Sequence, residues 1–156
     1  MMFFIQMVYN SGGYDRAETL NILEGFFDIY MPDFKFWDNN WADRLYRAPD
    51  YRKQAMAAIQ EMHRQVGDLV MDDKGVAVRG LLVRHLVMPN GIAGTWEIMK
   101  FLSDKISPDS YVNVMAQYRP CGEAVRDPMI DRRIMPEEYA AALRDTKAAG
   151  IHRLDR

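Results

Sequence analysis

Short apolar runs alternate with amphipathic stretches in the first part of the chain. An apolar run over residues 2–9 ends at the sequence Asn-Ser-Gly-Gly of residues 10–13, where two glycines permit a tight turn. Apolar residues at helical spacing follow over residues 15–25, and a second apolar run covers residues 26–31. Pro32 ends this run, because proline has no N–H group to donate to a sheet. This order predicts a strand, a helix and a second strand.

Two residues at the start of the first predicted helix indicate where it begins. Asp15 is followed three residues later by Glu18, which is the spacing of a capping box with aspartate in place of serine or threonine. Gly25 stands where a glycine commonly ends a helix. We therefore expect the helix to begin at Asp15 and to end before Gly25.

The central part of the chain changes from an aperiodic stretch to a long helical pattern. Residues 33–46 are rich in aromatic side chains without a clean period, which predicts a loop and a short helix. Residues 49–66 predict a longer helix, whose inner face carries four apolar residues: Ala55, Ile59, Met62 and Val66. Residues 69–80 predict a small hairpin, because Asp-Lys-Gly between two β-branched runs is typical turn chemistry. Residues 80–89 then predict a nearly continuous apolar strand.

The last third of the chain repeats the order of helix and strand. Residues 95–107 predict an amphipathic helix that Thr95 caps, with these residues facing inward: Trp96, Met99, and Leu102 or Ile106. Residues 110–118 predict a fourth substantial strand, and residues 119–133 form an irregular stretch. A last helix is predicted over residues 135–150, with proline in its first turn and glycine at its end.

The alternation of strands and helices predicts the fold class. Strands separated by helices pair in parallel through right-handed crossovers, so the chain is expected to be an α/β protein. Nearly apolar strands further predict a sheet that is covered on both faces or closed into part of a barrel. No internal repeat and no low-complexity linker interrupts the pattern. Residues 1–156 are therefore expected to form a single domain.

Composition and charge narrow the classes of function. The net charge of −2 leaves no basic stripe of the kind that binds a phosphate backbone, so nucleic acid is not an expected partner. No apolar run approaches the roughly 18 residues that a membrane span needs, and residues 1–10 lack the features of a signal peptide. The sequence therefore favours a cytoplasmic protein without a membrane partner. Cys121 is the only cysteine, which excludes an internal disulfide and any site built from several thiolates of this chain.

Polar residues stand at the end of each main predicted strand, where α/β folds collect their functional groups. In chain order they are Asn10, Ser11, Gly12, Asp33, Lys35, Arg84, His85, Gln117, Tyr118 and Arg119. Each one alone has an ordinary interpretation as a turn residue or a solvated ion pair. Together, two or three cations, a carboxylate and an amide suit a ligand that bears a carboxylate and ribose hydroxyls. Because side chains alternate along a strand, Arg84 and His85 must face opposite sides, and we expect His85 to face the helices.

Residues 8–38, 61–95 and 111–121 resemble the carboxyl-terminal part of the radical S-adenosylmethionine proteins related to pyruvate formate-lyase activating enzyme. The resemblance extends over nearly the whole chain and continues through residues 137–155. It is most specific in the sequence MPDFK followed by RGLLVRHLVMP. The resemblance implies a partial (β/α)6 barrel, of which this chain supplies about four parallel strands, a small hairpin and a C-terminal helix. S-adenosylmethionine would lie across the strand ends, against a [4Fe-4S] cluster.

The resemblance also implies roles for the residues at the strand ends. Asn10, Ser11 and Gly12 match the family's strand-end turn beside the cofactor. Asp33 and Lys35 match its acid-x-lysine pair near the ribose and the carboxylate, and Arg84 matches an arginine that contacts the methionine part. Arg119 follows Tyr118 where relatives have a histidine after a tyrosine. No residue is assigned a catalytic or metal-binding role.

Two motifs of the family are absent from this sequence. The family holds its cluster with a CxxxCxxC loop after the first strand and binds the methionine amine with a GGE-type segment after the second, and the chain contains neither. One cysteine cannot replace three thiolates. We therefore leave Cys121 out of the site and expect that this chain alone does not ligate a cluster.

Three functional hypotheses follow. The first is a radical S-adenosylmethionine oxidoreductase that generates a 5′-deoxyadenosyl radical for hydrogen abstraction from a glycine of a partner protein, or from another substrate. It is active only if a second polypeptide brings the cluster-binding half to the open sheet edge near residues 2–9. The second is a non-enzymatic binding or interaction module, either a homo-oligomer or a complex with a partner on that edge. The third is a truncated relic of such an enzyme.

Overall fold

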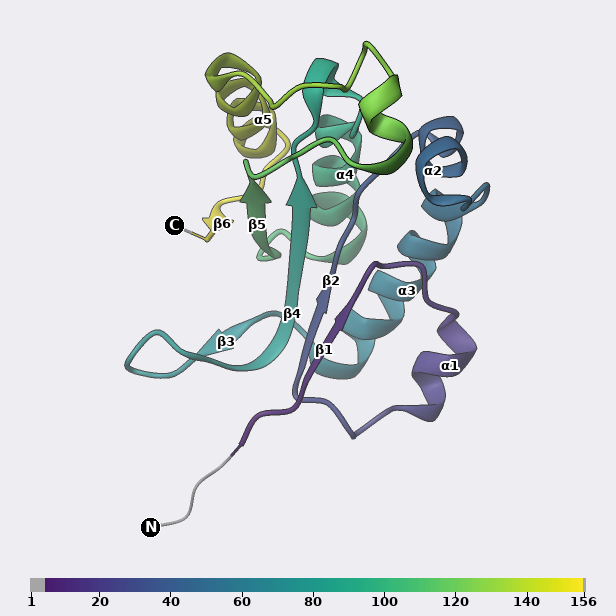
Figure 1. Ribbon diagram of the computed structural model, residues 1–156. Coiled ribbons are helices and arrows are strands. Elements are labelled where there is room, and N and C mark those ends of the chain that lie inside the picture. Colours follow the sequence, from purple (N-terminus) through teal and green to yellow (C-terminus); the bar gives the residue numbers. More distant parts are fainter. Residues whose placement is uncertain (1–4, 156) are drawn as a thin grey trace.

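The protein is an α/β fold in which helices pack on a mainly parallel sheet (Figure 1). The computed structural model describes residues 5–155. The strands are β1 (Val8–Ser11), β2 (Ile29–Pro32), β3 (Val70–Met71), β4 (Ala77–Leu86), β5 (Tyr111–Met115) and β6 (Arg153–Leu154). The α-helices are α1 (Ala17–Ile22), α2 (Asn39–Tyr46), α3 (Tyr51–Val66), α4 (Thr95–Phe101) and α5 (Pro136–Ala148). A π-helical turn, Leu102–Ile106, continues α4, and short 3₁₀ helices cover Pro89–Gly91 and Gly122–Arg126.

The parallel strands follow one another in the sheet in the same order as in the chain. Neighbours pair in the order β1, β2, β4, β5, β6, and each of these pairs is parallel. Strand β3 pairs with β4 in the antiparallel direction and forms the hairpin that the turn at residues 73–75 predicts. An isolated parallel bridge between Asp33 and Arg84 extends the contact of β2 with β4 beyond the end of β2. The predicted α/β class with a parallel sheet is therefore confirmed.

The helices cover one face of the sheet. Figure 1 shows α3 and α4 behind the strands; α1 packs against α3, and α5 packs against α4. Along β4 the side chains of Leu81, Val83 and His85 are buried beneath these helices, whereas Leu82, Arg84 and Leu86, on the other face, are only partly buried. No described helix crosses that second face, which we call the open face. None of the helices between residues 5 and 155 has the length and the apolar character needed to span a bilayer.

Two details of the predicted helices are wrong. Helix α1 begins at Ala17 with Arg16 as its N-cap, because the carboxylate of Asp15 instead accepts hydrogen bonds from the hydroxyls of Tyr9 and Ser11. Gly94, not Thr95, precedes the first residue of α4, because the Thr95 hydroxyl is hydrogen bonded to His85.

The inner face of α4 also differs from the prediction. Trp96 is 43% exposed, and the buried residues of this helix and its π-helical turn include Ile98, Met99 and Leu102. The prediction was therefore correct for Met99 and Leu102 and wrong for Trp96. The buried face follows the i, i+3, i+4 spacing, which includes Ile98 and leaves Trp96 outside.

Three strands, β1, β2 and β5, are shorter than the apolar runs that predict them. Strand β1 begins at Val8 rather than at residue 2, and residues 1–4 lie outside the described part of the chain. Strand β2 begins at Ile29 rather than at residue 26, and β5 ends at Met115 rather than at residue 118. The short strand β6 was not predicted, because two residues carry no measurable period.

His85 links two parts of the core through its buried ring, as the alternation of side chains predicts. One ring nitrogen, Nδ1, lies 2.8 Å from the carbonyl oxygen of Phe34, and the other, Nε2, lies 2.9 Å from the Thr95 hydroxyl. Burial disfavours the charged ring and lowers the pKa of His85 from its ordinary value of 6.5 to about 4. The ring is therefore neutral in the folded protein at neutral pH.

The low pKa of His85 predicts acid sensitivity of the fold. Below pH 6.5 the unfolded chain binds a proton at His85 that the folded chain does not bind. The free energy of unfolding should therefore decrease as the pH is lowered from 6.5 to 4, by about 1.4 kcal/mol per pH unit at most. Urea unfolding of the wild type and of His85→Gln, measured at several pH values in this range, checks this. The difference between the two proteins isolates His85 from other titrating groups. A pH-independent difference would contradict the prediction.

Candidate functional site

Four of the predicted residues meet at the carboxyl ends of β1, β2 and β4. Arg84 donates from Nε to Oδ1 of Asp33 at 2.7 Å and from Nη2 to Oδ1 of Asn10 at 2.9 Å. The Lys35 ammonium lies 3.0 Å from the other oxygen of Asp33. We call Asn10, Asp33, Lys35 and Arg84 the strand-end cluster. The structure therefore brings four of the predicted residues together, although they are up to 74 positions apart.

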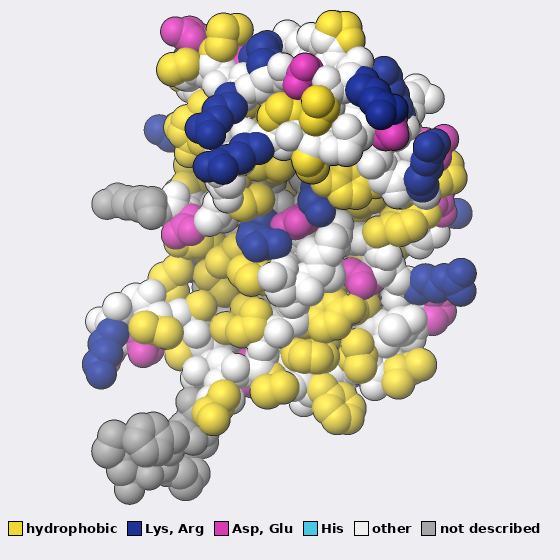
Figure 2. Space-filling model, in the orientation of Figure 1, with side chains coloured by type: hydrophobic (Ala, Val, Ile, Leu, Met, Phe, Trp, Pro, Cys, Tyr) yellow, Lys and Arg dark blue, Asp and Glu magenta, His cyan; other side chains and the backbone are white. Residues whose placement is uncertain are grey.

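The geometry of the strands explains why these side chains meet. Asn10 and Arg84 lie at alternating positions of their strands that face away from the helices. Asp33 follows Pro32 directly and continues the parallel pairing through its bridge to Arg84. Basic and acidic side chains gather midway up this open face, above a wider area of hydrophobic side chains (Figure 2). A polar site is thus set into a largely apolar face.

The Gly12-Gly13 turn brings the backbone close to this cluster. Gly13 has φ +76°, and a Cβ atom there would lie 2.0 Å from the carbonyl oxygen of Asp33. A Cβ atom on Gly12 would lie 3.7 Å from Nζ of Lys35. Only glycine fits at position 13, because a side chain would collide with the backbone of the neighbouring strand end.

Tyr51, at the start of α3, joins the strand ends and was not predicted from the sequence. Its buried hydroxyl accepts a hydrogen bond from the Lys35 amide at 2.9 Å, and it lies within donating distance of the carbonyls of Gly12 (3.0 Å) and Asp33 (3.1 Å). Burial raises the pKa of this phenol well above its ordinary value, so it stays protonated and able to donate. A tyrosine at a helix start carries no sequence signal for such a role, because its partners are backbone atoms.

Ser11 and Arg119, two more of the predicted site residues, lie outside the cluster. The Ser11 hydroxyl points to the helix side, where it donates to Asp15 and accepts from the amide of Gly13. Arg119 follows the end of β5 by four residues and is exposed in the loop beyond it. It lines a cavity of about 460 Å³ together with Tyr46, whose ring centroid lies 5.0 Å from Nζ of Lys35. Arg119 is therefore across a cavity from the cluster and shares no direct contact with it.

The charges of the strand-end cluster favour a ligand that carries an anionic group. Two cationic side chains share the single carboxylate of Asp33, so the cluster carries a net positive charge. Lysine and arginine have more N–H donors than this carboxylate uses, and the remaining donors can bind a carboxylate or hydroxyl oxygen. The residues present therefore fit the carboxylate and ribose of a nucleoside-type ligand.

The described residues do not fit an iron–sulfur cluster. Between residues 5 and 155, no group of three or more histidine, cysteine, aspartate or glutamate side chains is arranged to hold a metal. Cys121, the single thiol of the sequence, is exposed in the loop after β5. A cluster of the expected kind would need its thiolates from outside these residues.

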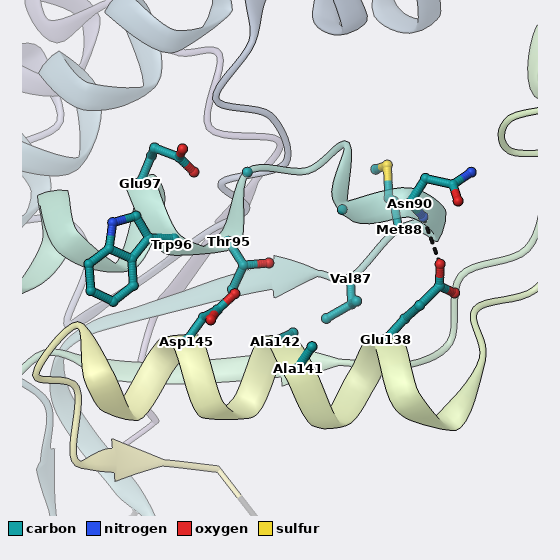
Figure 3. Close-up of a pocket in the computed structure, with 12 residues that line it drawn as sticks. Val87, Met88, Asn90, Thr95, Trp96, Glu97, Glu138, Ala141, Ala142 and Asp145 are labelled. Carbon is teal, nitrogen blue, oxygen red and sulfur yellow. Dashed lines mark hydrogen bonds between the residues drawn. The ribbon is translucent and has the colours of Figure 1, made fainter.

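A second cavity lies between α5 and the segment that begins α4, and it contains none of the predicted site residues. Its volume is about 240 Å³, and Figure 3 shows Ala141 and Ala142 of α5 on one side of it. Glu138 closes one end by accepting hydrogen bonds from the Asn90 amide and from Arg132. The Arg132 guanidinium lowers the pKa of Glu138 to about 2. This carboxylate therefore serves to hold the 89–91 turn against α5.

The chain is similar to part of a longer archaeal protein. The chain is 36% identical over 140 residues to an uncharacterized protein of Methanocaldococcus jannaschii. The match covers 89% of this chain and 37% of that protein, so the chain spans little more than a third of the relative's length. No protein-family profile and no solved structure matches the chain.

Two glycines with positive φ allow a test of the close approach at the turn. Gly13 and Gly25 have φ of +76° and +85°, but a Cβ atom on Gly25 would meet nothing within 4 Å. Gly13→Ala should therefore lower the free energy of unfolding more than Gly25→Ala, by about 1–3 kcal/mol, because both pay the cost of positive φ and only one collides with backbone. Urea unfolding at pH 7.5 measures the difference. Equal losses would show that the turn can move away from Asp33.

Proposed function

We propose that the strand-end cluster binds S-adenosylmethionine, as part of a protein of the radical S-adenosylmethionine type related to pyruvate formate-lyase activating enzyme. The observation that carries the proposal is the position of Asp33 between Arg84 and Lys35 at the carboxyl ends of adjacent parallel strands. In this assignment Arg84 and Lys35 take the cofactor's carboxylate. Asn10 and Asp33 remain as acceptors for the ribose hydroxyls.

The strand order supports a partial (β/α) barrel as the framework. In a doubly wound sheet the order reverses at a switch point and helices cover both faces. Here the order is sequential and the helices lie on one face, which is the arrangement of a barrel wall. In this framework the open face is the barrel interior, and the strand-end cluster lies at the mouth where barrel enzymes bind their ligands.

The chain's contribution in this proposal is binding and orientation. The family's reaction produces a 5′-deoxyadenosyl radical that takes hydrogen from a glycine of a partner protein, and it needs an electron from a [4Fe-4S] cluster. The described residues supply no ligand set for that cluster. Activity would therefore require a polypeptide segment that carries the three thiolates to the same mouth.

Binding of S-adenosylmethionine to the chain is the direct test. We expect saturable binding in a calorimetric titration, weakened about tenfold or more in Lys35→Ala and in Arg84→Ala, because each loses a charge-assisted hydrogen bond worth about 1.5–3 kcal/mol. Lys100→Ala and Arg64→Ala are matched controls, because these side chains form exposed ion pairs on helices away from the cluster. Near-ultraviolet circular dichroism verifies that each variant is folded.

The possible outcomes separate the functional hypotheses. Binding that all four substitutions weaken equally would indicate a general charge effect and would contradict the assignment to the cluster. A folded wild-type chain that does not bind would favour the non-enzymatic interaction module or the truncated relic. The exposed apolar side chains along β1 already suit such a module.

A further inference from the structure

The outer edge of β1 is free among the described residues. The strand order begins at β1, and β2 is its pairing partner in the described part of the chain. The carbonyl oxygens of Met7 and Ser11 accept hydrogen bonds from the amides of Ile29 and Asp33, on the β2 side. Because backbone groups alternate in direction along a strand, the N–H and C=O groups of Val8 and Asn10 point to the outer edge.

This edge lacks the features that usually protect an exposed strand. Natural edge strands carry charged residues or proline, but residues 5–11 contain neither. Three apolar side chains along it are largely exposed: Ile5 (82%), Met7 (52%) and Val8 (46%). A backbone that offers free hydrogen-bonding groups next to apolar side chains is suited to pairing with another strand.

The open face of the sheet also suggests a partner that covers it. Parallel sheets are normally covered on both faces, and here a single face is covered. The relative from Methanocaldococcus jannaschii contains the matched segment within a chain of which about three fifths lies outside the match. That length of chain is sufficient for further β/α units beside β1.

We propose that the outer edge of β1 pairs in parallel with a β-strand of a further polypeptide segment, which extends the sheet and encloses the open face. A second copy of this chain does not satisfy the same geometry. Two β1 strands related by a two-fold axis in one sheet run antiparallel, whereas every main strand pair of this sheet is parallel. The proposal rests on the free edge and does not require S-adenosylmethionine.

The test uses the parts of the Methanocaldococcus jannaschii relative outside the matched region as the probe. Amide hydrogen exchange of the ¹⁵N-labelled chain is measured by NMR with and without this polypeptide. We expect the amides of Val8 and Asn10 to exchange at least about tenfold more slowly in the complex, because only the outward groups gain a partner. The amides of Tyr9 and Ser11 should already be protected by β2. A chain that folds only with the probe and then shows the same protection also supports the proposal.

Two variants and one mass measurement complete the test. Val8→Lys places a charge on the edge and should abolish the protection, whereas Ile22→Lys, at a 77% exposed position of α1, should preserve it. Unchanged exchange at Val8 and Asn10 in the presence of the probe overturns the proposal. A dimer of the chain alone by light scattering, with these two amides protected, overturns it in favour of a second copy. Failure to bind S-adenosylmethionine would leave this result unaffected and would count against the proposed function alone.

Discussion

The Asp33 carboxylate is the contact on which the arrangement of the strand ends depends. It is 8% exposed, and its two oxygens lie within 3.0 Å of the Arg84 guanidinium and the Lys35 ammonium. A largely buried carboxylate is stable only when cations and hydrogen bonds replace its lost water. Arg84 in turn reaches Asn10, so a single carboxylate connects side chains at the ends of β1, β2 and β4. Removal of Asp33 would leave two neighbouring cations without a counter-ion.

The rest of the fold keeps this contact in place. On the helix side of the same strands, His85 pairs with the backbone of Phe34, the residue between Asp33 and Lys35. Because neighbouring side chains of a strand point to opposite faces, Arg84 contacts Asp33 on the open face and His85 contacts the Phe34 carbonyl on the helix side. Side chains of β4 therefore bind the segment after β2 on both faces of the sheet. The backbone at Lys35 is held as well, because its amide donates a hydrogen bond to the Tyr51 hydroxyl.

The sequence predicted the part of the site that strand periodicity controls. Alternation along residues 80–89 was enough to separate Arg84 from His85, and Asp33 and Lys35 had to lie beyond the strand that Pro32 ends. It failed for Arg119, because an apolar run does not reveal that pairing with β4 stops at Met115. The sequence could not identify Tyr51, because its hydroxyl is hydrogen bonded to backbone atoms, among them the Gly12 carbonyl and the Lys35 amide. Such contacts depend on tertiary packing, which no local pattern encodes.

Contacts within the strand-end cluster orient its donors, and this affects how it can bind a ligand. Its cations are held by Asp33, and the backbone beneath them is held by a phenol that burial keeps protonated. A ligand carboxylate would therefore meet donors that are already oriented, and little side-chain entropy would be lost on binding. The same pairing lowers the attraction, because Asp33 neutralises part of the positive charge. A ligand that brings hydroxyls for Asp33 as well as a carboxylate for the cations would use both, and this combination favours a nucleoside whose tail bears a carboxylate over a simple anion.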